Sequence, residues 1–332
     1  MARGKVYNKV YNEELWKKVN KENKVIMNDF LDEYKQRKKS KNTIEQYYYD
    51  LRIVLIYILK ELDNRCILDL KKKDFRRFNL WCQDKGMSNA RVNRLMSSVR
   101  SMLTFVEDDE DYDYEINYAS KVKGLAKEPV RINEDDFFMT FDQVMRLREE
   151  LLNRDETQLA LFVSIAFDSA GRRAELHQIT KHGLLEGNKT NIVIGKRGKK
   201  FPLVYLNDTK ELIRKWLEER GEDDIDSLWI IGKGENKKPA SYEVLYDWVI
   251  KISNILSEIE GKNISIFCHS FRHSRVECLL QGEDTRLLDK SGNPRKYTLE
   301  EVQKFCHHSS SDVTQSYAKN HDEDVIDDMF GF

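Results

Sequence analysis

The chain has 332 residues, of which 40% are hydrophobic and 34% are charged, and its formal net charge is −1. This length and composition indicate a globular protein large enough for two domains. No apolar run approaches the roughly 20 residues that span a bilayer, and the polar N-terminus lacks the apolar core of a signal peptide. We therefore expect a cytoplasmic protein with no membrane partner.

The near-neutral total conceals an uneven distribution of charge. One acidic cluster spans residues 107–111, whereas basic residues gather at 35–41, 71–77 and 196–200. This pattern fits a basic face backed by an acidic one, and equally a mixed, well-solvated surface. The five cysteines are odd in number and no pair has C-x-x-C spacing, so a disulfide scaffold is not expected.

Residues 20–118 are predicted to form an all-helical domain, after an N-terminal extension of residues 1–19. Apolar side chains recur at helical spacing from about 25 to 38, and Asn42 with Glu45 three residues later is typical of a second helix start. A third helix is expected over about 74–85, and Ser88 is predicted to cap a fourth.

The helical pattern lapses before a second domain at 137–332. Residues 119–136 contain Gly124 and Pro129 and lack sustained periodicity, which favours an interdomain linker. Lys121 and Lys123 give this segment a positive charge that would suit a strap along a phosphate backbone. A plain solvated linker fits the same residues equally well.

The second domain is predicted to be mostly helical with a small antiparallel β-sheet. Its first helix starts at Thr140, and two strands at 191–194 and 201–206 are joined by a turn rich in lysine and glycine. Asp208 or Thr209 is expected to cap a helix that ends at Gly221. The other predicted elements are an apolar helix at 159–167, a buried stretch at 228–231, helices at 242–259, 269–280, 299–305 and 312–317, and a loop at 282–296.

Six polar residues of the second domain form a set suited to breaking a phosphodiester bond without a metal. Arginines neutralise the non-bridging oxygens, a lysine protonates the leaving oxygen, a histidine accepts the proton of the nucleophile, and a tyrosine supplies the nucleophilic oxygen. Each residue alone is more typical of a structural role, but their joint order favours catalysis. The set consists of Arg172, Lys196, His269, Arg272, His308 and Tyr317.

The order and spacing of these residues resemble the tyrosine recombinases, also called the phage integrase family. The family pattern is Arg, then Lys in a β-hairpin, then His-x-x-Arg, then His or Trp, then Tyr. The family stretch G-L-R-x-x-E-L is present as AGRRAEL, I-G-K-x-x-K begins at Ile194, and L-G-H-S…T-x-Y is present as CHHSSSDVTQSY. The resemblance covers the second domain and, more loosely, the first, where KNTIEQYYYDL is similar to the family's core-binding opening.

The resemblance implies a site-specific recombinase that cleaves and rejoins DNA through a covalent 3′-phosphotyrosyl bond and a Holliday junction, with no metal, ATP or other cofactor. It implies two lobes clamped around double-stranded DNA in a Xer-like or Cre-like layout, a homo-tetramer on two recombination sites, and accessory bending or directionality factors. Such a protein is nucleoid-associated when bound. Glu175 is expected to orient the active-site cations. The residues expected to contact DNA are Thr43, Arg91, Arg94, Lys121, Lys123 and Lys199.

Three features depart from the family pattern. Arg173 follows Arg172 where the family usually has an apolar residue, and the spacing to Glu175 selects Arg172 as the catalytic residue. His307 stands where the family usually has glycine, and the nine-residue step to the tyrosine selects the next histidine. The loop at 282–296 makes its segment longer than usual.

Two other classes of protein remain open. A DNA-binding regulator of the same fold would have lost catalysis, although the set of polar residues is complete here. A zinc-binding protein would use the cysteines and histidines at 268–278 and 306–308, and His269 and His273 are spaced to share a helix face. Against zinc, the H-E-x-x-H glutamate and any C-x-x-C pair are missing, and Arg272 would add positive charge beside the metal.

Overall fold

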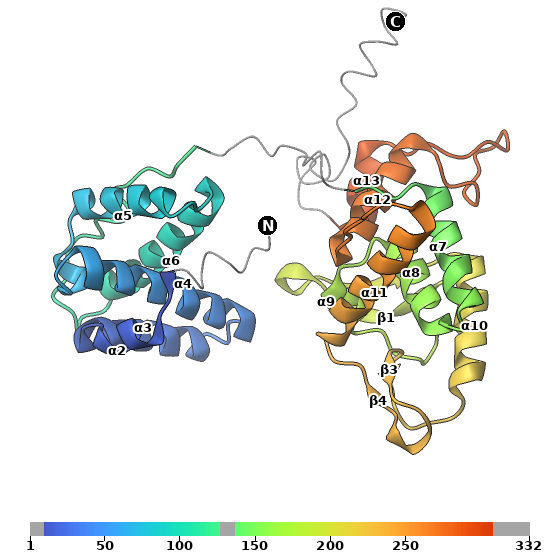
Figure 1. Cartoon of the computed structure of the whole chain (residues 1–332), viewed down its shortest axis with the longest axis horizontal. Coiled ribbons are helices and arrows are strands. Elements are labelled where there is room, and N and C mark those ends of the chain that lie inside the picture. The colour runs from blue at the N-terminus through green and yellow to red at the C-terminus, as the bar shows by residue number, and fades with distance from the viewer. Residues whose placement is uncertain (1–9, 127–136, 308–332) are drawn as a thin grey trace, which may run out of the picture. The chain divides into compact units, whose positions relative to one another are not determined.

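The computed structural model describes residues 10–126 and 137–307, and the chain divides into two compact units, residues 1–130 and 131–332. Figure 1 shows the N-terminal unit built from helices and the C-terminal unit built from helices with short strands. The predicted fold class, mostly helical with small antiparallel sheets, is confirmed. No helix within the described ranges is long and apolar enough to cross a membrane.

The N-terminal unit has a single helical core. α3, α4 and α6 pack together because each carries a stripe of apolar side chains, among them Phe30, Leu51, Leu55 and Val99, which are fully buried. Ser88 caps α6 as predicted, since its hydroxyl accepts the N–H of the third helical residue. The described elements are α2 (Glu13–Lys18), α3 (Lys21–Gln36), α4 (Lys41–Glu61), the turn η1 (Ile67–Asp69), α5 (Lys72–Asp84) and α6 (Asn89–Asp108).

Helix α2 lies within the segment predicted as an extension. Its six residues are too few to display a helical repeat, so the sequence pattern does not reveal it. The Arg52 guanidinium of α4 lies 3.9 Å from the Tyr11 ring centre and 4.9 Å from the Trp16 ring centre, and it donates to Glu13 at 3.1 Å. These contacts make residues 10–19 part of the folded unit.

The predicted start of the second helix is wrong by two residues. α4 begins at Lys41, because the Ser40 hydroxyl accepts the backbone N–H of Thr43 at 3.2 Å. Asn42, expected to be the cap, lies inside the first turn. Serine and asparagine are both good caps, so the pattern alone does not decide between neighbours.

The first part of the predicted linker is folded onto the N-terminal unit. Ala119 and Val122 are buried in the helical core, and Arg100 donates to their carbonyl oxygens at 3.2 and 2.9 Å. The predicted boundary at residue 119 therefore falls inside a packed segment, because a turn shows no periodic pattern even when it packs. Lys121 and Lys123 are exposed on this segment.

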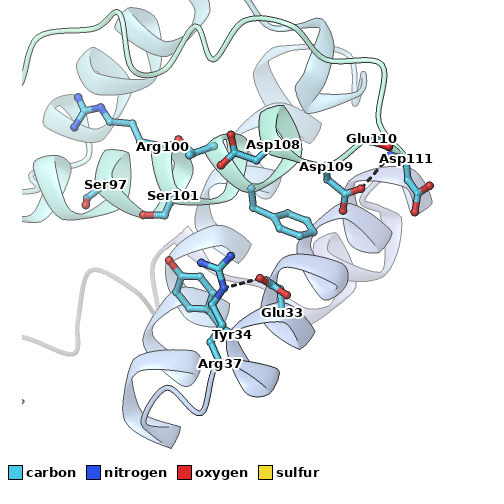
Figure 2. A pocket seen from close by; sticks show the side chains of 12 residues that line it. Glu33, Tyr34, Arg37, Ser97, Arg100, Ser101, Asp108, Asp109, Glu110 and Asp111 are labelled. Atoms are coloured by element: carbon cyan, nitrogen blue, oxygen red, sulfur yellow. Dashed lines mark hydrogen bonds and ion pairs between the residues drawn. The ribbon is translucent and has the colours of Figure 1, made fainter. Parts of the chain in front are cut away.

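A hollow of about 750 Å³ opens between α3 and α6 (Figure 2). Acidic side chains line one end, where Asp109 and Asp111 follow α6, and Glu33 of α3 pairs with Arg37 directly after that helix. A lining with this excess of carboxylates repels phosphate, so the hollow is unsuited to DNA. The residues predicted to contact DNA do not line it.

The C-terminal unit is organised around α8 (Thr157–Ser169), in which every residue except Gln158 is buried. α7 (Phe141–Asn153), α10 (Asn207–Arg220) and α12 (Cys268–Gln281) pack around it, as expected for a helix that is apolar on all sides. Thr140 caps α7 as predicted. The other described helices and turns are α9 (Arg173–Leu176), η2 (Lys196–Gly198), η3 (Gly234–Asn236), α11 (Val244–Glu260) and α13 (Leu299–Phe305).

Two small antiparallel ladders lie in the described part of this unit, residues 137–307. β1 (Lys189–Ile194) pairs with β2 (Lys200–Val204), and Ile194 lies opposite Lys200. β3 (Ile230–Ile231) pairs with β4 (Lys238–Pro239). The hairpin predicted from the alternating sequence is confirmed, with Val193 buried and Ile192 exposed as a period of two requires.

The predicted cap of α10 is wrong. The helix begins at Asn207, before Asp208 and Thr209. The carboxylate of Asp168 on α8 accepts the Leu206 N–H at 3.0 Å and the Thr209 hydroxyl at 2.6 Å. A tertiary contact therefore takes the place of the local cap.

Buried ion pairs hold the loop at 282–296 against the helices. Arg286 donates to Asp168 on α8 at 2.7 Å, to Asp208 on α10 at 2.9 Å and to Asp284 in the loop at 2.9 Å. Two further arginines complete the network: Arg275 of α12 pairs with Asp284, and Arg148 of α7 pairs with Asp208. The loop insertion is thus linked to α8 and to the three helices α7, α10 and α12 that pack around it.

Candidate active site

Arg172 stands directly before α9, and Glu175 fixes it there. The Glu175 carboxylate accepts the Arg172 backbone N–H at 2.8 Å and its guanidinium at 2.9 Å. Glu175 is 1% exposed, so a buried acceptor orients a side chain that remains partly exposed. Arg173 instead lies over the Tyr242 ring, 3.7 Å from its centre. The two neighbouring arginines therefore have separate environments.

Two backbone carbonyls hold the guanidinium of Arg272, which is 2% exposed on α12. Its terminal nitrogens donate to the carbonyl oxygen of Ala170 at 2.5 Å and to that of Cys306 at 2.6 Å. Ala170 has φ 49°, and His307, directly after Cys306, has φ 53°. Both values lie in the left-handed region that favours glycine, and both residues occupy glycine positions of the family patterns.

His269 lies in the first turn of α12, one turn before Arg272. Burial and the positive charges of His273, Arg272 and Arg172 lower the pKa of His269, and Glu175 opposes this change. A lowered pKa keeps the imidazole neutral at neutral pH, the form that accepts a proton. Arg172, directly before α9, and Arg272, on α12, therefore both act on His269.

The β1–β2 turn carries an exposed Lys196 and approaches Glu175 closely. A Cβ built on Gly195 would lie 3.0 Å from the Glu175 carboxylate and 2.7 Å from the Phe201 ring. Glycine is required here because no side chain fits the gap, while its φ of −87° is ordinary. The glycine of the hairpin motif thus brings the lysine turn next to the Arg172–Glu175 pair.

A cavity of about 250 Å³ lies among these groups. The His307 ring stacks on Phe201 with 3.9 Å between ring centres, and Lys199 donates to the His307 carbonyl at 3.3 Å. Burial lowers the pKa of His307, with further lowering by Lys199, Arg272 and Arg172. Sequence patterns do not select His307 as a site residue; its place at a family glycine was the available signal. The lining includes Ser169, Glu175, Lys189, Phe201, Arg272 and Cys306.

The structure brings together Arg172, Glu175, His269 and Arg272, and it places the turn of Lys196 nearby. His308 and Tyr317 lie outside the described residues. The cysteines and histidines of the alternative zinc site form no group of three metal ligands within the described ranges.

The arginines predicted to contact DNA lie on α6 beside a buried carboxylate. Asp50 of α4, 1% exposed, pairs with Arg91 at 2.6 Å and with Arg94 at 3.2 Å. The Arg94 side chain remains 48% exposed. The Thr43 hydroxyl lies 2.7 Å from that of Ser40, at the start of α4. Their contact with DNA stays a prediction.

Family models match both units. Residues 27–109 match the phage integrase N-terminal SAM-like domain, and residues 137–324, more than half of the chain, match the phage integrase family. The chain belongs to the phage integrase family. It is a tyrosine-type site-specific recombinase that acts on DNA.

Relatives of this recombinase share its length. The SPbeta prophage-derived recombinase-like protein YomM of Bacillus subtilis (strain 168) is 28% identical to this chain. The alignment covers 83% of this chain and 84% of the length of YomM. Tyrosine recombinase XerC of Treponema denticola is 27% identical over 85% of this chain and 89% of its own.

Solved structures show the same fold. XerH site-specific recombinase in a post-cleavage complex with a palindromic difH substrate has a TM-score of 0.64 at 18% identity, over 89% of this chain and 81% of its own. A lambda integrase tetramer bound to a Holliday junction has a TM-score of 0.64 at 12% identity, over 90% of this chain and 77% of its own.

Proposed function

We propose that the recombinase cuts DNA by attack of Tyr317 on a phosphodiester bond, which forms a 3′-phosphotyrosyl bond and frees a 5′-hydroxyl. Two observations support this most directly: buried Glu175 orients the Arg172 guanidinium at 2.9 Å, and the charges of Arg172 and Arg272 both lower the pKa of His269. Arg272 also binds the carbonyl of Cys306, two residues before His308. A phenol has a pKa of about 10, so about one tyrosine in a thousand is ionised at neutral pH, and a cationic site with a base is needed.

Each predicted residue has one task in this reaction. Arg172 and Arg272 neutralise the non-bridging oxygens, and His269 accepts the Tyr317 proton. Lys196 protonates the leaving 5′-oxygen, which the turn can reach by closing over the substrate. His308 donates to the phosphate. The phosphotyrosyl bond conserves the energy of the broken diester, so rejoining needs no ATP, and side chains supply the positive charge that a metal would otherwise provide.

We further propose that the helical N-terminal unit and the catalytic C-terminal unit bind opposite sides of one duplex. Thr43, Arg91, Arg94, Lys121 and Lys123 would contact it, with Lys199 near the cleaved strand. A homo-tetramer on two recombination sites would exchange strands through a Holliday junction. The similarity to the lambda integrase tetramer on a Holliday junction supports this assembly.

Covalent capture from a library of random duplexes tests the chemistry. The full-length protein is incubated with the library in excess EDTA and denatured, and protein-linked DNA is sequenced. The wild type should retain DNA joined through its 3′ end. Tyr317→Phe should bind duplex DNA and retain none covalently, while the control Tyr297→Phe, which keeps its ring beside Arg295, should behave as the wild type.

Three outcomes would contradict the proposal. An adduct formed by Tyr317→Phe would assign another nucleophile. Binding by the wild type with no adduct on any recovered sequence would favour a DNA-binding regulator that lacks catalysis. An adduct that forms only when a divalent metal is restored would favour a metal-dependent site.

A further inference from the structure

Arg173 is a half-buried cation that the catalytic roles leave unused. It follows Arg172 directly and is the first residue of α9. Among the described residues its guanidinium makes no ion pair, and Glu243, whose pKa its charge helps to lower, is not paired with it. Partial burial of an unpaired charge is unfavourable, so an apolar side chain would suit a purely structural position better.

Two tyrosines of the α11 region hold Arg173 in place. The guanidinium carbon lies 3.7 Å from the Tyr242 ring centre and 5.6 Å from the Tyr246 ring centre. Tyr242 is half-buried and Tyr246 is 43% exposed. Stacking uses the face of a guanidinium and leaves its in-plane N–H groups for other acceptors. The stack therefore fixes the cation without satisfying its donors.

The stack borders the candidate active site. The charge of Arg173 opposes the rise that burial causes in the pKa of Cys268, the residue directly before His269. Glu175 holds the guanidinium of Arg172, whereas the Tyr242 ring holds that of Arg173. Because the two cations have different partners, the second suits a different anion beside the first.

We propose that Arg173, held flat on Tyr242, binds a phosphate of the DNA backbone next to the phosphate that Arg172 contacts. The position of Arg172 at the cleaved phosphate rests on the proposed function. Arg173 contributes affinity and helps to fix the position of the DNA strand relative to the protein, since contacts to phosphate position a protein without reading sequence. Its donors find there the acceptors that residues 10–126 and 137–307 do not provide.

The test measures binding to a 30-base-pair duplex of arbitrary sequence by fluorescence anisotropy over a range of salt concentrations. All variants carry Tyr317→Phe, so binding is separated from cleavage and from any failure of the nucleophile assignment. Arg173→Leu should weaken binding about tenfold and reduce the slope of log K against log salt by about 0.9, the loss of one phosphate contact. The control Arg214→Leu, which removes a surface arginine paired with Glu211 on α10, should change neither.

Two further variants separate charge from stacking. Arg173→Lys keeps the positive charge and should keep the slope while losing affinity about threefold, because an ammonium is not held flat. Tyr242→Leu should also keep the salt slope and lose affinity about threefold, since it removes the ring on which Arg173 stacks and leaves the positive charge. The proposal is overturned if Arg173→Leu matches Arg214→Leu in slope and affinity, because the stack of Arg173 on Tyr242 would then have only a structural role within the protein. It is also overturned if the loss depends on sequence with an unchanged slope, which would indicate contact with bases.

Discussion

Arg286→Met should lower the free energy of unfolding of the C-terminal unit, because it removes the cation that joins the loop to α8 and α10. The side chains of Asp168 and Asp284 are 1% and 2% exposed, and breaking a buried pair of this kind costs about 3–5 kcal/mol. Asp284 keeps Arg275 and Asp208 keeps Arg148, which places the loss near the lower end, about 3 kcal/mol. For a unit of this size the melting temperature should fall by roughly 6–12 °C.

The effect should depend on pH with a defined sign. Burial alone would raise the pKa of Asp284 and Asp208, but their arginine partners outweigh burial and lower both values. A carboxyl whose pKa is lower in the folded state stabilises the fold above its unfolded pKa, about 3.9, and loses that contribution as the pH falls through the folded value. The difference between wild type and Arg286→Met should therefore be full at pH 7 and shrink towards pH 3.

Urea denaturation followed by tryptophan fluorescence measures this difference. In a Trp16→Phe, Trp81→Phe background the three remaining tryptophans all lie in the C-terminal unit. The control Arg295→Met removes an exposed pair with Glu301 and should cost at most about 1 kcal/mol. Equal losses in the two variants, or a loss in Arg286→Met that grows as the pH falls, would refute the assignment of a buried network.

The other predictions concern the hairpin and use DNA recovered by covalent capture. Gly195→Ala places a methyl group against Glu175 and Phe201, and displacement of the lysine turn should slow covalent trapping about a hundredfold in single-turnover assays. Gly187→Ala, where the added carbon meets nothing within 4 Å, is the matched control and should trap at the wild-type rate. A substrate with a 5′-bridging sulfur, whose leaving group needs no proton, should rescue Lys196→Ala but not Arg172→Ala; rescue of both or neither would remove Lys196 as the acid.

Periodic and short-range features of the fold were predictable from the sequence. The helices of the first domain, the hairpin and the caps Ser88 and Thr140 follow from spacing and local hydrogen-bonding chemistry. The start of α10 was not predictable, because the Leu206 N–H and the Thr209 hydroxyl donate to the carboxylate of Asp168, some forty residues earlier in the chain. α2 and the packed turn at 119–122 show too little repeat to be recognised.

The candidate site also contains residues that the sequence predicts and contacts that it does not. Residue types, order and spacing select Arg172, His269 and Arg272, and the structure brings these three together. The partners that orient them are harder to foresee: the carbonyls of Ala170 and Cys306 carry no side-chain signature, and the stack of Arg173 on Tyr242 joins residues about seventy positions apart. Backbone acceptors and long-range stacking leave no pattern in a single sequence.

The two carbonyls that hold Arg272 give this residue a second task besides carrying charge. By bridging the end of α8 to Cys306, it clamps the last backbone before the segment that bears His308 and Tyr317. Lysine has a single nitrogen and cannot clasp both carbonyls with the same fork. Under the proposed mechanism, loss of activity in an Arg272 variant would therefore combine weaker phosphate binding with loss of the contact that holds the backbone of Cys306. The partner of Arg172 is a side chain three residues away, so a variant of Arg172 measures the effect of the lost charge with less disturbance of the backbone.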